Sequence, residues 1–308
     1  MLEPTMFMGT SAWKLQNDVL MAIILPEHGG KVASLVYRSQ NWELLFQNPN
    51  GTFRKAHRGD DFSDYEACGF DDAFPTVDAC EVQMGGRTVQ YPDHGELWSA
   101  AFTAEAIGEM LCLRWQSPEL GYTYEKQIHL AGNRLVCSYR IHNPGNEPLP
   151  ALWVCHCLVH CEPGMRIVMP PEVTQVENTF TSDWLGEATT KLSYPMAAGP
   201  RGNIDLQVMP PDGALKYYAA SAVKEGCCRY EYPASQMAAQ LEYDSTMLPY
   251  LGFWATGGGY RGDINCALEP TNGYYDGIPN ARQHNACPVL TPDETWNFTL
   301  SIQLYPLV

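Results

Sequence analysis

Short apolar runs separated by turn residues make up most of this chain. Runs with a helical apolar period and no Gly or Pro are few, whereas strand-like runs are frequent. The last run alternates most clearly, because every second residue is apolar: Phe298, Leu300, Ile302 and Leu304. The predicted strands span residues 19–25, 32–37, 88–91, 100–106, 110–115, 122–130, 135–142, 149–160, 165–169, 215–222, 238–243, 250–255, 264–269 and 297–305.

Turn sequences stand between these runs, such as Asn-Pro-Gly-Asn at 143–146 and Pro-Asp-Gly at 211–213. Short strands with regular turns predict an all-β fold, a large antiparallel β-sandwich with few short helices, and not βαβ units. We find no linker, composition shift or fixed repeat, so we expect a single domain over residues 1–308. The irregular stretch 48–80 is longer than an ordinary connection, and loops of that length commonly are functional or carry some local structure.

Composition and charge restrict the partners. The chain has 308 residues, 45% of them apolar and 18% charged, which is typical of a folded globular protein. Its formal net charge of −16 argues against nucleic acid and against an anionic membrane surface. No apolar run approaches the roughly 20 residues of a membrane span, and the first residues do not read as a signal peptide. The eleven cysteines, an odd number without framework spacing, favour reduced thiols and a cytoplasmic location.

One carboxylate ends the apolar run 264–269 and is followed at once by a Pro, Asn, Gly and Tyr loop. If the run is a strand, its residues alternate between two faces. Ile264, Cys266 and Leu268 then point into a core, whereas Asn265, Ala267 and Glu269 point the other way. A Glu at this position suits a fixed catalytic base. The alternative is a solvated glutamate on an edge strand.

Five possible metal ligands fall within residues 155–161, but they lack a CxxC pair and a second pair downstream. Strand alternation separates them, with His156, Leu158 and His160 on one face and Cys155, Cys157 and Cys161 on the other. Cysteines on an apolar strand face usually act as small buried residues, so we expect no metal site. A histidine on the other face either is a core residue or completes an acid–base pair with Glu269.

Two polar loops add candidate ligands for a sugar. Asp-His-Gly at 93–95 predicts a turn before Trp98, and its His94 is either a surface residue or a site residue. Asp71 and Asp72 stand among aromatic residues in the long irregular stretch. Carboxylates and aromatic rings together suit a neutral polyhydroxylated ligand, and Trp98, Trp153, Trp184 and Trp254 are candidate stacking platforms. No phosphate-binding glycine loop, nucleophile elbow or His-Glu-x-x-His motif occurs, so we expect no cofactor.

In this order, these pieces resemble the galactose mutarotase-like (aldose 1-epimerase) superfamily. The segments that carry the resemblance are His28–Leu35 with Glu43-Leu44-Leu45, Asp93-His94-Gly95, Trp153-x-x-His156 with Gly164 and Met169-Pro170, Leu268-Glu269-Pro270-Thr271, and Leu290–Leu304. The resemblance spans about residues 20–305. It implies a large antiparallel β-sandwich with a sugar cleft on one sheet.

The resemblance also implies roles for three residues. Glu269 would take the proton from the anomeric O1 hydroxyl, His156 would protonate the ring oxygen O5, and His94 would hold or help protonate it. Asp71 or Asp72 would hold the substrate, and Trp98, His160 and Arg54 are further candidates for sugar contact. The expected partner is a small-molecule sugar, with neither metal nor cofactor; the sequence says nothing of the oligomeric state.

The chain departs from the family pattern at two places. Cys157, Leu158 and Val159 follow the second histidine, where aldose epimerases carry an aromatic residue and Asn. Glu96 follows the first His-Gly, where the hexose-phosphate branch has Arg. The second departure favours a free sugar, although Arg54 and Arg58 keep a phosphorylated one open. The first leaves an alternative function open, a non-catalytic carbohydrate-binding protein on the same scaffold; a metal or thiol enzyme built on residues 155–161 is a third hypothesis.

Overall fold

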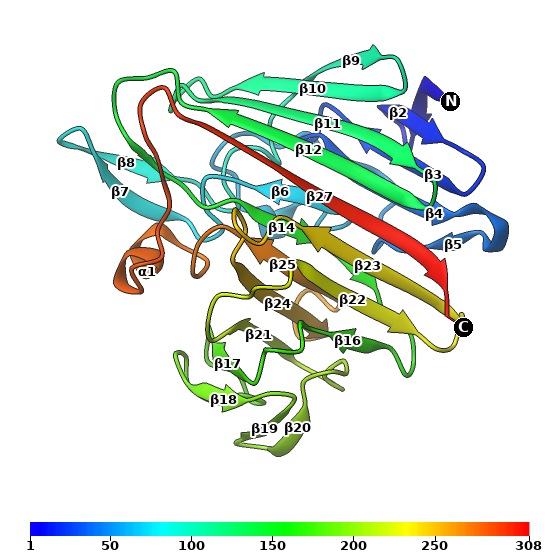
Figure 1. The fold of residues 1–308 in the computed structure, drawn as a ribbon, viewed down its shortest axis with the longest axis vertical. Coiled ribbons are helices and arrows are strands. Elements are labelled where there is room, and N and C mark those ends of the chain that lie inside the picture. The colour runs from blue at the N-terminus through cyan, green and yellow to red at the C-terminus, as the bar shows by residue number, and fades with distance from the viewer. Residues whose placement is uncertain (308) are drawn as a thin grey trace.

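Two large antiparallel sheets pack face to face in the computed structural model, which describes residues 1–307 (Figure 1). The thirteen-stranded sheet has eleven strands in one path: β1 (Leu2–Phe7), β2 (Thr10–Gln16), β3 (Leu20–Leu25), β4 (Lys31–Tyr37), β6 (Phe70–Ala73), β14 (Val154–Cys157), β25 (Ile264–Thr271), β24 (Tyr250–Gly257), β21 (Ala214–Ala219), β17 (Gln175–Asn178) and β18 (Lys191–Ser193). Off this path, β5 (Trp42–Glu43) pairs with β4 and β15 (Val159–His160) pairs with β25.

The eight-stranded sheet lies in front in Figure 1. Its order is β16 (Arg166–Val168), β22 (Cys227–Tyr232), β23 (Met237–Tyr243), β27 (Thr295–Pro306), β12 (Arg134–His142), β11 (Thr123–Ala131), β10 (Met110–Gln116) and β9 (Thr103–Ile107). Three two-stranded sheets complete the fold: β7 (Cys80–Met84) with β8 (Arg87–Tyr91), β13 (Leu149–Pro150) with β26 (Val289–Leu290), and β19 (Met196–Gly199) with β20 (Gly202–Asp205). The helical segments of residues 1–307 are α1 (Ile278–Gln283) and the 3₁₀ turns η1 (Arg38–Gln40) and η2 (Phe62–Asp64).

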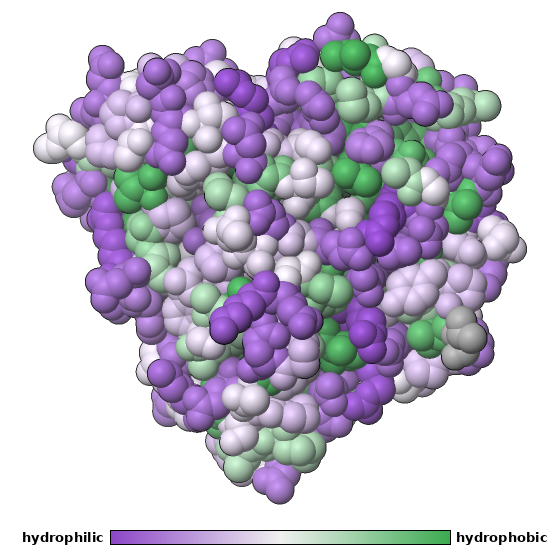
Figure 2. Space-filling model, viewed as in Figure 1, coloured by the Kyte–Doolittle hydropathy of each residue, from purple (hydrophilic) through white to green (hydrophobic). Residues whose placement is uncertain are grey.

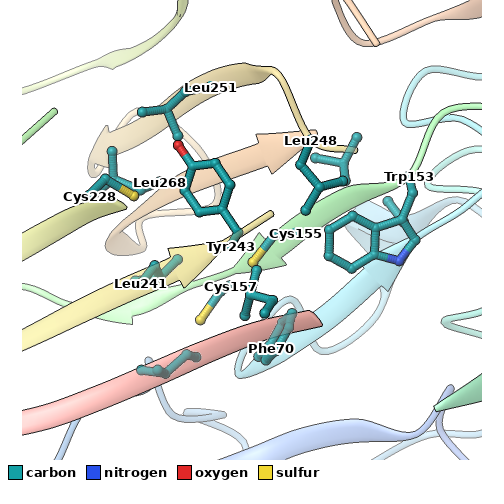
Figure 3. Close-up of a cluster of buried hydrophobic side chains, with 14 of the residues drawn as sticks. Phe70, Trp153, Cys155, Cys157, Cys228, Leu241, Tyr243, Leu248, Leu251 and Leu268 are labelled. Carbon is teal, nitrogen blue, oxygen red and sulfur yellow. The ribbon is translucent and has the colours of Figure 1, made fainter. Parts of the chain in front are cut away.

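The space between the large sheets is filled by apolar side chains, which occur at every second position along the strands. Figure 3 shows part of this core, where Trp153, Cys155 and Cys157 meet side chains of the facing sheet, among them Leu241 and Tyr243. Cys155 and Cys157 are completely buried, so they act as small apolar residues, as predicted. The outward positions of the eight-stranded sheet are mostly polar, with exceptions such as the exposed Ile107 of β9. Figure 2 shows this side of the molecule as mostly hydrophilic, with apolar residues in small separate groups.

The predicted antiparallel β-sandwich is confirmed, and most predicted strands lie within a few residues of observed ones. The run 149–160 divides into β13, β14 and β15. The hairpin of β1 and β2 was missed because its residues are mixed in polarity and mostly half-buried. Strand β6 was missed because two aspartates stand at its centre. Ile264 was expected in the core but is 56% exposed at the start of β25.

No helix within residues 1–307 is both long enough and apolar enough to cross a membrane.

Candidate active site

A row of cross-strand neighbours on the thirteen-stranded sheet contains the predicted base and acid. In the pairing of β14 with β25, the ladder contains the pair Val154–Thr271, and in that register His156 on β14 is level with Glu269 on β25. The next pair, formed by β15, keeps the same register. The His156 and Glu269 side chains line one cavity.

The cavity has a volume of about 250 Å³ and collects rings and charges from distant parts of the chain. Its aromatic residues are Phe62, Phe180, Trp254 and Tyr260. Its charged, polar and imidazole residues are Asp78, His94, His156, Thr179, Lys216, Asp263, Asn265, Glu269 and Asp276, and Ala67, Val77 and Leu158 complete the lining. Aromatic walls with a few convergent polar groups are typical of sites for small molecules.

Glu269 is fixed on β25 as the alternation predicted, with Asn265 on the same cavity face and Cys266 and Leu268 in the core. The Glu269 residue is only 1% exposed, and neither carboxylate oxygen accepts a hydrogen bond from the rest of residues 1–307. The Lys216 ammonium lies 3.2 Å from Oε2. Burial raises the pKa of Glu269, and the positive charge of Lys216 opposes that rise. Oε1 therefore has no partner within residues 1–307 and remains available to accept a proton.

His156 is 7% exposed, and its Nδ1 has no hydrogen-bond partner within residues 1–307. Burial holds the pKa of His156 well below its usual value, and the positive charges of His94 and Lys216 lower it further. The His156 ring is therefore neutral at pH 7 and presents an unused ring nitrogen in the buried region beside Glu269.

His94 is held in a tight turn between β8 and the following segment. Its φ is +53°, and the next residue, Gly95, has φ +74°. A Cβ on Gly95 would lie 2.0 Å from the carbonyl oxygen of Phe74, so only glycine fits there. The His94 Nδ1 lies 2.9 Å from Oδ1 of Asp93, whose other oxygen accepts the Phe62 N–H at 2.9 Å.

The Phe62 ring from the long loop completes the imidazole pair. It stacks on His94 with 4.0 Å between ring centroids and meets His156 edge-on at 5.3 Å. The two imidazoles are themselves 5.0 Å apart. The irregular stretch predicted over 48–80 therefore does contribute to the site, through Phe62, Ala67, Val77 and Asp78.

Lys216 and Asp276 are site residues that the sequence reasoning missed. The Lys216 ammonium lies 2.7 Å from Oδ1 of Asp276, and both residues are buried. The sequence did contain an indication that Lys216 has a charged partner. Lys216 interrupts an apolar run predicted as a strand, and lysine is almost never buried without a partner. Asp276 follows the Tyr-Tyr pair of the late loop, and nothing in its spacing distinguishes it from an ordinary loop residue.

Of the four tryptophans considered as stacking platforms, only Trp254 lines the cavity. Its ring meets Tyr260 edge-on at 5.7 Å, and Phe180 lies 6.3 Å away. Trp153 is a core residue, and Trp184 packs against Arg201 away from the cavity. Trp98 lies one layer behind the lining, with its ring edge-on to Phe62 at 5.2 Å.

The two aspartates expected to hold the sugar lie elsewhere, in buried ion pairs. Asp71 is opposite His156 in the sheet, but its carboxylate binds Lys31 and does not line the cavity. Asp72 points to the other face of β6, into the core, where it lies 2.9 Å from Lys126 and accepts the Tyr139 hydroxyl. The sequence could not show this, because the partner lysines are far away in the chain.

His160 and Arg54 also lie outside the cavity lining. His160 packs against Trp42 and Tyr232, and its ring nitrogens face the Leu44 carbonyl and Glu162. Its side chain turns away from the cavity, although β15 keeps the register of β14 with β25 and His160 lies opposite Asn265. Arg54 donates from Nε to Glu66 at 2.8 Å on the outer side of the long loop.

No group of three or more His, Cys, Asp or Glu suited to a metal ion occurs among residues 1–307, which include the segment 155–161. The cysteines of this segment that lie in β14 face the core, and His156 faces the cavity. This separation gives no support to the hypothesis of a metal or thiol enzyme.

Comparison with known proteins finds similarity in three dimensions only. No protein-family model and no curated protein sequence matches this chain. Among solved structures, an Escherichia coli K12 protein described as a candidate aldose 1-epimerase is 18% identical with a TM-score of 0.71, over 96% of this chain and 99% of that one. A galactose mutarotase-related enzyme from Lactobacillus acidophilus is 16% identical with a TM-score of 0.70, over 96% and 98%. A galactose mutarotase-like protein from Clostridium acetobutylicum is 13% identical with a TM-score of 0.71, over 100% and 99%.

Proposed function

We propose that this chain, which has the galactose mutarotase-like fold, is an aldose 1-epimerase-type isomerase that interconverts the α and β anomers of a free sugar. One observation carries the proposal. Glu269 and His156 are buried on the paired strands β25 and β14, each has an unpartnered polar atom, and both line the same cavity. A carboxylate and an imidazole held this way are the groups that general base and general acid catalysis require.

In the proposed reaction a Glu269 oxygen takes the proton of the anomeric O1 hydroxyl. The O1–H electrons form the C1=O1 double bond, the C1–O5 bond breaks, and O5 takes up a proton from the imidazole pair. The aldehyde turns about the C1–C2 bond, O5 adds to its other face, and both protons return. The net change is the inverted configuration at C1, without any oxidant, reductant or cofactor.

The two imidazoles, His156 and His94, have different proposed roles at the ring oxygen O5. The sequence-based assignment makes His156 the acid, but burial disfavours a positive charge on His156. The Asp93 carboxylate lies beside His94 and offsets the charge of a protonated His94 ring. We therefore propose that His156 donates a hydrogen bond to O5 as a neutral ring and that His94 carries the proton that O5 takes up.

The charge of the cavity supports a sugar without phosphate. Four carboxylates line it, and its one ammonium, Lys216, is bound by two of them. Arg54 and Arg58, which kept a phosphorylated substrate open, are bound to Glu66 and Glu96. Carboxylates accept hydrogen bonds from sugar hydroxyls, and the aromatic wall suits the apolar face of a pyranose ring.

The direct test is polarimetry on freshly dissolved α-glucose and α-galactose with wild type and Glu269→Gln. Wild type should accelerate mutarotation, and the variant should lose about 10²–10⁴-fold of that acceleration because the base is gone. Circular dichroism and thermal melting of the variant control for folding. A folded Glu269→Gln protein that keeps the wild-type rate rules out the assignment of the base.

The ion pair between Lys216 and Glu269 favours a second candidate, a sugar-binding protein without turnover. A carboxylate that is permanently neutralised by an ammonium at 3.2 Å is a weaker base. This candidate predicts saturable binding of a monosaccharide in titration calorimetry with no change in the rate of mutarotation. Acceleration by the same preparation would exclude it.

The cytoplasm remains our proposed location, supported by the odd number of cysteines and the absence of framework spacing. A monosaccharide is the proposed partner.

A further inference from the structure

The Lys216 ammonium lies in the cavity between two carboxylates from a different part of the chain. It is 3.2 Å from Oε2 of Glu269 on β25 and 2.7 Å from Oδ1 of Asp276 in the segment that follows. The three side chains are 11%, 1% and 8% exposed. A buried lysine with two anionic neighbours stays charged, since either carboxylate alone would compensate it.

The position of the ammonium is set by more than these two contacts. The Tyr218 hydroxyl donates to Oδ1 of Asp276 at 2.8 Å, the same oxygen that Lys216 contacts. The main-chain oxygen of Asp276 accepts the N–H groups of Val77 and Asp78, both at 2.9 Å. Asp276 is therefore held at its side chain and at its backbone, and it holds Lys216 in turn.

A glycine in the sheet makes room for this arrangement. Gly252 lies opposite Glu269 on one side and opposite Tyr218 on the other. A Cβ on Gly252 would lie 2.9 Å from Cζ of Tyr218, so the tyrosine ring lies over the place where a side chain would be. Strand β24 lies between Tyr218 on β21 and Glu269 on β25. Because Gly252 has no side chain, the Tyr218 ring can occupy the space above β24.

The charges that act on Glu269 come from several elements. Lys216 on β21 and His94 in the turn after β8 favour its ionised form, and Asp276 opposes it. His156 on β14 is neutral, and Asp78 after β6 adds a further carboxylate to the lining. Without Lys216, the negative charge of Asp276 would act on Glu269 without compensation and would raise the pKa of Glu269 further.

We propose that Lys216 is a positioning residue that keeps Glu269 ionised for proton abstraction, and that Asp276 and Tyr218 hold its ammonium in place. The inference rests on the proposed epimerase function. The two carboxylates beside Lys216 also disfavour covalent catalysis by this residue. A Schiff base with the open-chain aldehyde needs a neutral amine, and the pKa of Lys216 is raised by Asp276 and Glu269 although burial opposes this.

The test compares the pH dependence of mutarotation for wild type, Lys216→Met and Lys216→Arg, from about pH 5 to about pH 9. Loss of an opposite charge at this distance raises a carboxyl pKa by about 1–3 units. The acidic limb of kcat/KM should therefore move up by that amount in Lys216→Met, so activity is lost at neutral pH and partly regained in alkaline solution. Lys216→Arg should keep the wild-type profile.

A merely structural role predicts a different result, an unshifted profile with a lower rate at every pH, which would overturn the proposal. If Lys216→Met does not fold, Tyr218→Phe provides the second variant, with a smaller shift in the same direction. An acidic limb that stays in place in folded Tyr218→Phe overturns the role given to Tyr218. A covalent sugar adduct on Lys216 after borohydride treatment would also contradict the proposal.

A readout independent of turnover separates this inference from the proposed function. Carboxyl infrared titration, with Glu269→Gln to assign the band, should show Glu269 ionised at pH 7 in wild type and protonated in Lys216→Met. If wild type does not accelerate mutarotation, the epimerase proposal fails, and this titration still decides whether Lys216 keeps Glu269 ionised. If wild type is active and the band is the same in both proteins, only the role of Lys216 is wrong.

Discussion

Burial affects the two opposed residues of the cavity in opposite senses. The pKa of Glu269 is raised and that of His156 is lowered, because both groups lose the water that stabilises their charged forms. Only Glu269 has an adjacent opposite charge, the Lys216 ammonium. Burial therefore favours a neutral His156 ring, and Lys216 favours the ionised form of Glu269; these are the forms that the proposed reaction uses at its start.

This arrangement predicts a pH dependence of stability. The pKa of His156 is lower in the folded state than the roughly 6.5 of an unfolded chain, so unfolding takes up a proton when the pH falls below about 6.5. The stability contribution is present above that pH and is lost below it, by up to about 1.4 kcal/mol per pH unit. As the pH is lowered from about 7.5 to 5.5, the melting temperature should therefore fall more steeply in wild type than in His156→Gln.

The matched control for this measurement is His57→Gln, because the His57 side chain is 77% exposed. Its melting temperatures should follow those of wild type at every pH. Equal slopes for wild type and His156→Gln would contradict a buried neutral His156.

At the scale of elements, the strands that pack beside a side chain determine which charged partner it contacts. Strand β6 shows this most clearly, because Asp71 and Asp72 are adjacent in sequence and point to opposite faces of the sheet. Each is bound by a lysine from another strand, Lys31 or Lys126. Neither carboxylate is free for a substrate, and the cavity takes its acidic residues from β25 and from loops instead.

The turn that carries His94 leads to a prediction about activity. Gly95→Ala places a Cβ 2.0 Å from the Phe74 carbonyl oxygen, so the turn must shift and move His94 away from Phe62 and His156. We expect mutarotation to fall by at least about tenfold, because displacements near 1 Å at a site cost about 10²-fold. The measurement is kcat/KM for the mutarotation of α-glucose.

Gly108→Ala is the control for the effect of backbone conformation alone. Gly108 also has a positive φ, +62°, but nothing lies within 4 Å of the added Cβ. It should lose only about 1 kcal/mol of stability and keep its activity. Equal activity in the two variants would show that the position of His94 is not critical.

At the scale of the whole molecule, we expect charge to disfavour anionic ligands before they reach the cavity. The net charge of −16 repels anions in solution, and the cavity adds carboxylates at close range. An anionic sugar that enters displaces water from these carboxylates without gaining a free cation, because Lys216 is already bound by Glu269 and Asp276.

Three sugars with one pyranose frame test this selection: glucose, glucose 6-phosphate and glucuronate. Wild type should accelerate mutarotation of glucose and should favour it over the two anions by at least about tenfold in kcat/KM. Added salt should narrow the difference, since it screens the long-range part of the repulsion. A preference for glucose 6-phosphate would show that the cavity is not selective against anions.

Local pattern in the sequence determined the all-β fold and the strand that carries Glu269. A period of two along a strand is set by backbone geometry, so it places Glu269 and Asn265 opposite Cys266 and Leu268 without any knowledge of neighbours. The resemblance also directed attention to His94 and His156, which line the same cavity as Glu269.

Only the tertiary structure decided which polar groups meet. Lys216 reaches Glu269, and Lys31 and Lys126 reach Asp71 and Asp72, across strands that are far apart in the chain. A buried charge is stable only beside a group of opposite charge. Which group that is depends on the order of the strands in the sheet, and the hydrophobic period along one strand does not predict that order. The same sequence could therefore indicate a site with a base in it, while the neighbours that set the ionisation of that base came from the packing of the sheets.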